Sequence, residues 1–474
     1  MRTSRQYLES LRKMRPNVYM NGKVIQRDDP RLMGGINVIS TTFDFAADPK
    51  YADLMTARSH LTGKTINRFT HVHQSVDDLL KKQEMTRLLC QQVGGCIQRC
   101  MGIDGTNALS VVTKDCDNVF GTNYHERFLK WLEYFQENDM VACCAQTDVK
   151  GDRSKRPYEQ ADPDLYVRIV EKRDDGIIVR GAKNHITIAP YAEEIIVVPT
   201  RMLTEKDADY AVAFAIPADT PGVKLVTRAT MPRERKYLKT DKVIGSADCF
   251  VIFEDVFVPK ERVFLCGEYQ FGGMLALMFA LYHRHSYTGC KPAATDVIMG
   301  QAALVAEYNG IEKAPHVRDK LADMVAVAEL VYGAGIASAV KAKKAASGTC
   351  VPDVVFANVA RYHAGVKLYH EYEILADLSG GLPATLPPEE DFYNPETGPL
   401  LNKYIMRNPK ISAENQHRLF RLLSDTLCSA HSGVMQVAGL HGGGSPIMEK
   451  IAIMGTYDMD AKKKIAKHLA GIKD

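Results

Sequence analysis

Residues 281–296 read LYHRHSYTGCKPAATD and place a histidine, a phenol, a thiol and an amine within nine residues. An α-helix has about 3.6 residues per turn, so positions i, i+4 and i+7 lie on one stripe. The spacing therefore predicts a helix in which His283, Tyr287 and Cys290 share a face and Lys291 flanks them. Pro292 predicts a break just after Cys290, because proline removes a helical hydrogen bond.

Length and composition point to a multidomain globular enzyme. The chain has 474 residues, which exceeds one ordinary core, and 60 basic against 57 acidic residues give a net charge of +3. That near-balance gives no reason to expect nucleic acid or a membrane as a partner. The N-terminal residues lack the apolar run of a signal peptide, and no long apolar run predicts a membrane span. The 11 cysteines fit thiols in a reducing, cytoplasmic setting better than disulfides.

The chain divides into three regions by the period of its apolar residues. Helical spacing dominates residues 1–140, and it returns in residues 271–474. Residues 141–270 contain short β-branched runs such as GIIVRG and CFVIFEDVFVP, separated by Gly, Pro and Asp. We therefore predict an α+β chain with an N-terminal helical domain, a middle β-domain and a C-terminal helical domain.

A second cluster, GGCIQRCMG at residues 94–102, places Cys96 and Cys100 four residues apart. On a helix these thiols would share a face, although cysteine pairs also occur in ordinary cores. Together with His283 and Cys290 they make a set of three thiolates and one imidazole. Such a set suits zinc or an iron–sulfur cluster, and the spacing does not decide between them.

Two loops carry weaker signals. In AQTDVKGDRSKRP, residues 145–157, Gly151, Asp152 and Arg153 could offer backbone amides and a cation to a phosphate-bearing cofactor. The HGGGSP loop at 441–446 could let the backbone approach a ligand closely. Both are equally compatible with ordinary turns.

The motifs CIQRC, YHRHSYTGCK, TDVKGDR, GAKNHIT and HGGGSP together resemble the 4-hydroxybutyryl-CoA dehydratases, which are also vinylacetyl-CoA delta-isomerases. The resemblance runs nearly end to end. It places the chain in the superfamily of the flavin-dependent 4-hydroxyphenylacetate 3-monooxygenases (HpaB-like), which implies an acyl-CoA-dehydrogenase-like fold. The monooxygenase relatives lack the cluster motifs, so these motifs are specific.

The resemblance implies a set of functional residues. Metal ligands of a [4Fe-4S] cluster would be Cys96, Cys100, Cys290 and His283. FAD would contact Gln146, Thr147, Asp148, Gly151, Asp152, Arg153, His185 and Thr187. Catalytic positions near substrate and flavin would be His283, Tyr287, Lys291, Thr187, Gln98 and Asp248. The assembly would be a homotetramer acting on an acyl-CoA, with FAD sites shared between subunits.

The chemistry that the resemblance implies is a redox-neutral dehydration of 4-hydroxybutyryl-CoA to crotonyl-CoA. One-electron oxidation by flavin would acidify the C3 hydrogen, and the electron is later returned. The cluster would assist departure of the hydroxyl as a Lewis acid, and His283 is a candidate base.

Two positions depart from the family pattern. Asp248 stands where the pattern has glutamate, and Ala438 stands where it has another glutamate, three residues before His441. Three hypotheses follow: a dehydratase with isomerase activity, a paralogue with the same cofactors acting on another acyl-CoA or only as an isomerase, and a flavin monooxygenase or a catalytically silent flavin- and cluster-binding protein.

Overall fold

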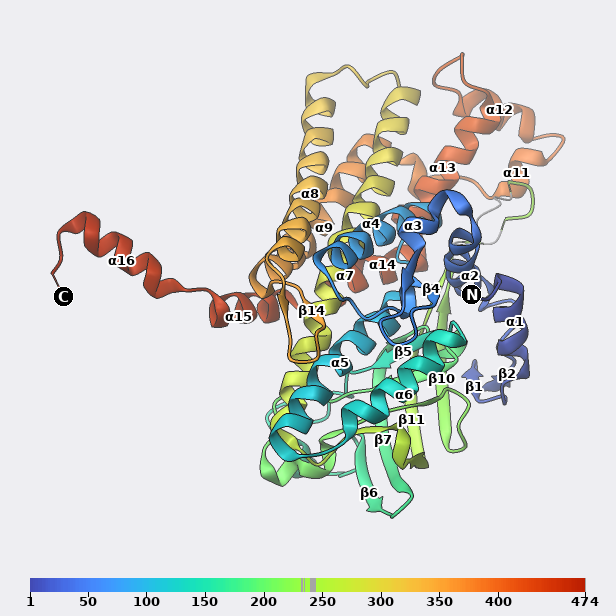
Figure 1. The fold of residues 1–474 in the computed structure, drawn as a ribbon. Coiled ribbons are helices and arrows are strands. Elements are labelled where there is room, and N and C mark those ends of the chain that lie inside the picture. The colour runs from blue at the N-terminus through green and yellow to red at the C-terminus, as the bar shows by residue number, and fades with distance from the viewer. Residues whose placement is uncertain (232, 234, 239–243, 474) are drawn as a thin grey trace.

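The computed structural model describes every residue except 232, 234, 239–243 and 474 (Figure 1). The helices are α1 Ser4–Lys13, α2 Met33–Ala47, α3 Ala52–Met55, α4 Val76–Val93, α5 Cys100–Phe120, α6 Tyr124–Glu137, α7 Tyr269–Tyr308, α8 Pro315–Val340, α9 Val354–Ser379, α10 Leu382–Thr385, α11 Glu389–Tyr393, α12 Gly398–Ile405, α13 Ala413–Cys428, α14 Ala430–His441, α15 Pro446–Thr456 and α16 Met459–Ala470. The strands are β1 Val18–Met20, β2 Lys23–Ile25, β3 Thr56–Arg58, β4 Thr65–Asn67, β5 Ala142–Ala145, β6 Arg168–Lys172, β7 Gly176–Thr187, β8 Glu194–Val197, β9 Val212–Pro217, β10 Val223–Thr230, β11 Ser246–Pro259, β12 Val263–Cys266, β13 Lys343–Lys344 and β14 Cys350–Val351. The predicted α+β class is confirmed.

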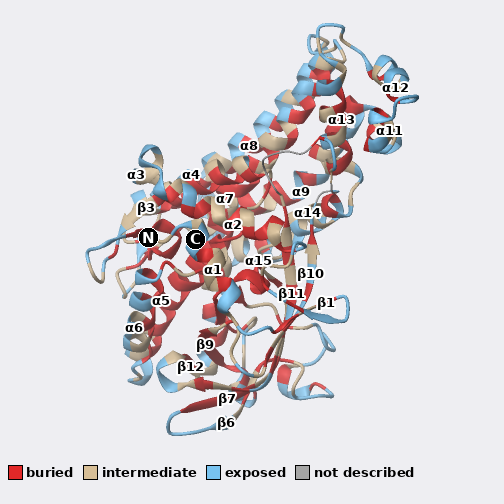
Figure 2. Ribbon diagram, turned by 90° about the vertical axis from the view of Figure 1, so that its right-hand side faces the viewer, coloured by how far each residue is buried: buried red, intermediate tan, exposed pale blue. Residues whose placement is uncertain are grey.

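Two sheets build the middle of the chain. The larger has the strand order β2-β1-β10-β11-β7-β6, and the smaller has the order β12-β9-β8-β5. Residues such as Val251, Phe253 and Phe214 face inward from these strands, and the two sheets share one buried apolar core (Figure 2). In β11 alternate residues are buried, as expected of a strand with one face on a core. The long β7–β11 pair brings Asp248 opposite Thr187.

The hairpin β1–β2 lies in the N-terminal region, which was expected to be helical. β1 pairs in parallel with β10, and β2 extends the sheet by one more strand. Strands of three residues leave too few positions to show a period, so only the tertiary pairing makes them visible.

The helix α7 confirms the helix predicted over the opening stretch and runs through the centre of the helical part (Figure 1). The predicted break at Pro292 is wrong, because the helix continues from Tyr269 to Tyr308. Proline leaves the carbonyl of Thr288 without its usual donor. The side-chain amide of Gln83 on α4 donates to that carbonyl at 3.2 Å, so the helix continues across the proline.

Two helices leave apolar surface exposed. Within the described part of the chain, α8 is the one helix long and apolar enough to cross a membrane. It lies in the bundle beside α7 and α9, and core helices of soluble proteins commonly have the same length and apolar composition. The last helix, α16, projects away from the body, with the C-terminus beyond it (Figure 1). Ile465 and Leu469 on α16 are 55% and 80% exposed, respectively.

Candidate functional site

Three of the predicted ligands form one chain of thiols. Cys96 lies in the loop after α4, Cys100 begins α5, and Cys290 lies on α7. The expected helix face shared by Cys96 and Cys100 is therefore wrong, because α5 begins only at Cys100. The thiols of Cys100 and Cys290 are both hydrogen-bonded to Cys96, and these bonds lower the pKa of Cys96 well below that of a free thiol. A fourth thiol, Cys90, is hydrogen-bonded to Cys290. Its sulfur also accepts the amide N–H of Ile97 at 3.3 Å.

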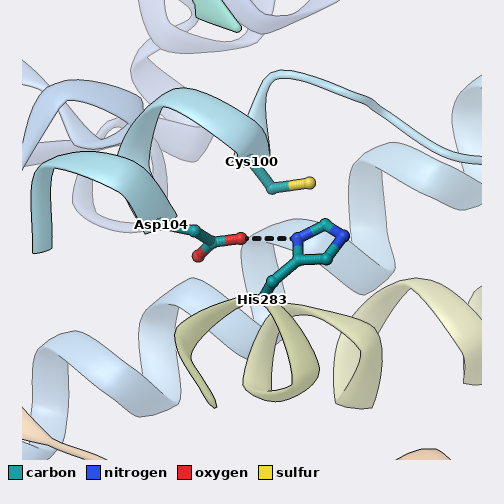
Figure 3. Close-up of side chains that lie close together, drawn as sticks. All are labelled: Cys100, Asp104 and His283. Atoms are coloured by element: carbon teal, nitrogen blue, oxygen red, sulfur yellow. Dashed lines mark hydrogen bonds and ion pairs between the residues drawn. The ribbon is translucent and has the colours of Figure 1, made fainter. Parts of the chain in front are cut away.

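The fourth predicted ligand, His283 on α7, lies beside Cys100 (Figure 3). Its Nδ1 atom is 2.9 Å from a carboxylate oxygen of Asp104 on α5. Ligand atoms of Cys100, Asp104 and His283 all lie within 4.8 Å of one another, and all three residues are buried. The structure thus brings together all four predicted ligands, and three thiols with an imidazole are a donor set suited to a soft metal centre.

Tyr287 and Lys291 flank the ligands on α7. The Tyr287 ring lies edge-on to His283, with centroids 5.0 Å apart, and the Arg361 guanidinium lies 4.6 Å from the Tyr287 centroid. Burial raises the pKa of Tyr287 well above the usual tyrosine range. Burial also lowers the pKa of Lys291, although nearby Glu371 opposes this shift.

The glycine loop between α14 and α15 covers Tyr287. A Cβ atom added to Gly442 would lie 1.8 Å from the Tyr287 hydroxyl oxygen, and one added to Gly443 would lie 3.4 Å from Cδ2 of His283. Arg361 donates to the Gly442 carbonyl oxygen at 2.7 and 2.9 Å and so fixes the loop. The backbone of HGGGSP thus closely approaches side chains of α7, and its approach to a ligand stays a prediction.

Gln98 links the loop before α5 to the segment leading into β11, and Thr187 and Asp248 face each other on strands β7 and β11. Gln98 has a φ of 64°, a backbone conformation that is strained for any residue other than glycine. Its amide donates to the Gly245 carbonyl at 2.8 Å. The Thr187 hydroxyl donates to the Asp248 carboxylate at 2.7 Å. Burial raises the pKa of Asp248, and this hydrogen bond partly offsets the rise.

The predicted flavin-binding segment lies at the start of the β-region. Asp148 is engaged by Lys183 at 2.6 Å, the Gln146 amide donates to the Ala276 carbonyl at 2.9 Å, and the Thr147 carbonyl accepts from Asn184 at 2.8 Å. The amide of Asp152 donates to Gln160 at 2.9 Å, so this amide is not free for a phosphate.

Three other residues predicted to contact the flavin differ in how they are held. Gly151 has a φ of 54°, which only glycine adopts readily. Arg153 is exposed, and in the part of the chain that the structure describes it has no ion-pair partner. His185 is exposed at the end of β7 and has a φ of 58°. A free cation and a strained, exposed loop end fit a phosphate-bearing cofactor.

This α+β fold gathers buried thiols, an imidazole and strained backbone between its helical bundle and its sheet. These features define the class of protein as a cofactor-dependent enzyme. The family models for the N-terminal and C-terminal parts of 4-hydroxyphenylacetate 3-hydroxylase match residues 3–265 and 273–471. The chain belongs to the 4-hydroxyphenylacetate 3-hydroxylase family.

The similar relatives include a dehydratase and a monooxygenase. The chain is 43% identical to the 4-hydroxybutyryl-CoA dehydratase/vinylacetyl-CoA delta-isomerase of Clostridium aminobutyricum, covering 99% of both chains. It is 28% identical to the 4-hydroxyphenylacetate 3-monooxygenase oxygenase component of Thermus thermophilus, covering 98% of this chain and 96% of the relative.

Solved structures of both kinds of enzyme are similar to this chain. An oxygen-tolerant archaeal 4-hydroxybutyryl-CoA dehydratase from N. maritimus superposes with a TM-score of 0.95 at 38% identity, covering 100% of this chain and 95% of the other. The oxygenase component HpaB complexed with FAD superposes with a TM-score of 0.85 at 26% identity, covering 99% and 98%. The fold is thus common to both kinds of enzyme, and the dehydratases are the more similar.

Three residues of the site escaped the sequence analysis. Asp104 follows Cys100 by one helical turn, so the same i, i+4 spacing that paired Cys96 with Cys100 could have indicated it. Cys90 precedes Cys96 in the same cysteine-rich segment, but lies on α4. Lys82, which donates to Asp104 at 2.6 Å, carries no sequence signal, because one lysine in a helix is normally solvated.

Proposed function

We propose that this chain dehydrates 4-hydroxybutyryl-CoA to crotonyl-CoA and isomerises vinylacetyl-CoA. The observation that carries the proposal is the meeting of Cys96, Cys100, Cys290 and His283 from two distant stretches of the sequence, 96–100 and 283–290. A flavin monooxygenase of the same family needs no such donor set. The 43% identity to the Clostridium enzyme over nearly the whole chain supports the same activity.

Two cofactors belong to this proposal. Cys96, Cys100, Cys290 and His283 would hold a [4Fe-4S] cluster, and the segment 146–153 with His185 and Thr187 would contact FAD. When bound, the flavin supplies reversible one-electron transfer and the cluster supplies a Lewis acid.

The side chains around the ligands have separate tasks. Once displaced from the metal centre, His283 would be the candidate acceptor of the substrate C3 proton at Nε2, since Nδ1 is bonded to Asp104. Burial keeps the Tyr287 hydroxyl protonated at neutral pH, so Tyr287 acts as a hydrogen-bond donor. Lys291 brings amine donors to the same stripe of α7. Gln98 holds the segment leading into β11, and Thr187 orients the Asp248 carboxylate.

The cofactors are tested on anaerobically purified protein. About four irons, matching sulfide and one FAD per chain are expected from this ligand set. The protein is then assayed on a panel that includes 4-hydroxybutyryl-CoA and vinylacetyl-CoA. A single zinc without sulfide, or hydroxylation of a phenol with reduced flavin and oxygen, would refute the proposal.

A second candidate function is that of a paralogue that mainly isomerises vinylacetyl-CoA or takes another acyl-CoA. It is favoured by Asp248, whose shorter side chain is tied to Thr187, and by Ala438, which supplies no carboxylate. Dehydration needs proton removal and assisted departure of hydroxide, whereas isomerisation needs proton movement only. Losing carboxylates should therefore harm dehydration more.

Restoring both carboxylates separates the two candidates. Asp248→Glu with Ala438→Glu should raise dehydration more than isomerisation, because one acid–base group contributes roughly 100- to 10,000-fold. If the unmodified protein already dehydrates 4-hydroxybutyryl-CoA as fast as a relative with both glutamates, the second candidate loses its support.

The remaining parts of the proposal concern the assembly and its setting. We infer a cytoplasmic homotetramer built from chains with domains 1–140, 141–270 and 271–474. The projecting helix α16 and the exposed apolar residues of α8, such as Leu330 at 63%, support association between copies of the chain.

A further inference from the structure

Asp104 makes four hydrogen bonds beside Cys100 and His283. One carboxylate oxygen accepts from Lys82 Nζ at 2.6 Å and from Ser286 Oγ at 2.9 Å. The other accepts from Ser286 Oγ at 3.0 Å and lies 2.9 Å from His283 Nδ1. Asp104 and Lys82 are completely buried, and His283 and Ser286 are nearly so.

The charges decide the direction of the bond to His283. The Lys82 ammonium also donates to the Tyr282 carbonyl at 2.9 Å, so it stays beside Asp104 as a buried cation. A carboxylate paired with that cation is ionised and can only accept hydrogen bonds. The hydrogen of neutral His283 must therefore reside on Nδ1, which leaves the lone pair on Nε2.

Direct binding of a metal by Asp104 is disfavoured by the same contacts. Both oxygens already face donors, so ligation would strip a buried ammonium or imidazole of its acceptor. Within the residues that the structure describes, none is hydrogen-bonded to Nε2 of His283. Of these three residues, Cys100 and His283 are thus the ones suited to bind a metal, and the Asp104 carboxylate supports His283.

The His283 ring is held on its other sides by aromatic contacts. Phe279, one helical turn earlier, stacks on it with a centroid distance of 5.6 Å and an interplanar angle of 6°. Tyr287, one turn later, meets it at 81°. Stacking fixes the plane of the ring but not which of its edges faces Asp104, and the hydrogen bond to Asp104 selects the edge that carries Nδ1.

We propose that Asp104, held by Lys82 and Ser286, is a positioning residue that fixes the Nδ1–H tautomer of His283 and aims Nε2 at the metal centre. This inference rests on the proposed function, since it takes His283 as a cluster ligand. A carboxylate behind a metal-bound histidine typically changes affinity or activity by about 10- to 100-fold when it is removed.

The test is pulsed electron paramagnetic resonance of the reduced cluster, which detects the ligating and the remote imidazole nitrogen. In Asp104→Asn the iron content should stay near the wild-type value, the quadrupole coupling of the remote nitrogen should shift, and turnover should fall by about 10- to 100-fold. Asp78→Asn is the matched control, because Asp78 also binds a histidine and a cation, His71 at 3.2 Å and Arg68 at 3.1 Å, away from the thiols. Its remote-nitrogen coupling should match the wild type.

A full complement of iron with an unchanged coupling in Asp104→Asn would overturn the inference. If that variant does not fold, Lys82→Gln is the second variant. It keeps every ligand and the Asp104 carboxylate but removes the ammonium that holds this carboxylate. An unchanged coupling in Lys82→Gln overturns the inference as well. Wild-type protein without iron and sulfide would instead refute the proposed function, and the inference with it.

Discussion

At the scale of single residues, Tyr287 and Lys291 are the side chains whose chemistry is easiest to separate from their packing. We expect Tyr287→Phe and Lys291→Gln each to keep iron, flavin and assembly but to lose about 100-fold or more of turnover, since each removes a donor beside the ligands. Anaerobic steady-state assays with cofactor analysis measure both effects.

Tyr282→Phe is the matched control for the tyrosine. Tyr282 is buried on the same helix, but its hydroxyl donates to the Cys350 carbonyl at 2.9 Å, so this variant should lose stability and little activity. Full turnover of Tyr287→Phe and Lys291→Gln would mean that both residues serve packing alone.

The sequence was informative about residues where chemistry follows helical spacing. His283, Tyr287 and Cys290 were predicted on one stripe of a helix, and the structure has that helix. The spacing of Asp104 from Cys100 was a local signal, but its bond to His283 was not predictable, because 179 residues separate the two. Lys82 was missed for the same reason, since its partners Asp104 and Tyr282 come from two other helices.

At the scale of elements, the glycine loop after α14 is a lid on Tyr287. Gly442→Ala should displace the Tyr287 ring or the loop, because the new methyl group would lie 1.8 Å from the hydroxyl oxygen. We expect turnover to fall by at least about 10-fold with iron retained, as when a reacting geometry shifts by about an ångström. Gly433→Ala on α14, where a Cβ meets nothing within 4 Å, is the control and should keep turnover.

The anchoring of α15 should depend on pH through Glu449. This side chain is fully buried, lies 3.9 Å from Arg284, and burial raises its pKa to about 7. Between the ordinary carboxyl pKa of 4.5 and about 7, the folded chain holds a proton that the unfolded chain releases, so rising pH removes stability. Glu449→Gln abolishes this loss.

Calorimetry at pH 5 and pH 8 checks the effect. The stability gained by Glu449→Gln over the wild type should be larger at the higher pH by on the order of 2 kcal/mol. An equal difference at both pH values would show that Glu449 stays ionised in the folded chain.

Helices and strands could be predicted from the sequence where the element was long or its polar and apolar residues alternated clearly. The long helix over 281–296 and the strand-rich region 141–270 follow from periodicity. Pro292 was misinterpreted because the helix is completed by Gln83, a contact across two helices. The hairpin β1–β2 was missed because its pairing partner β10 lies about two hundred residues away.

At the scale of the whole molecule, α16 is too exposed to be explained by one chain. We expect it to pack on another copy, so Ile465→Asp with Leu469→Asp should convert tetramers to smaller species in mass photometry. Lys464→Ala on the same helix is the control. Tetramers that persist in the double variant would place the interface elsewhere, for instance on α8.

The separation of the metal-binding side chains along the sequence has a consequence for biosynthesis. Cys96 and Cys100 leave the ribosome long before His283 and Cys290, with the whole strand-rich region between them. The donor atoms can meet only after α7 has docked on α4 and α5, which is a contact of high sequence separation and therefore slow to form. If these residues hold the proposed cluster, iron binds only after α7 has docked, and the nascent chain carries reactive thiols until then.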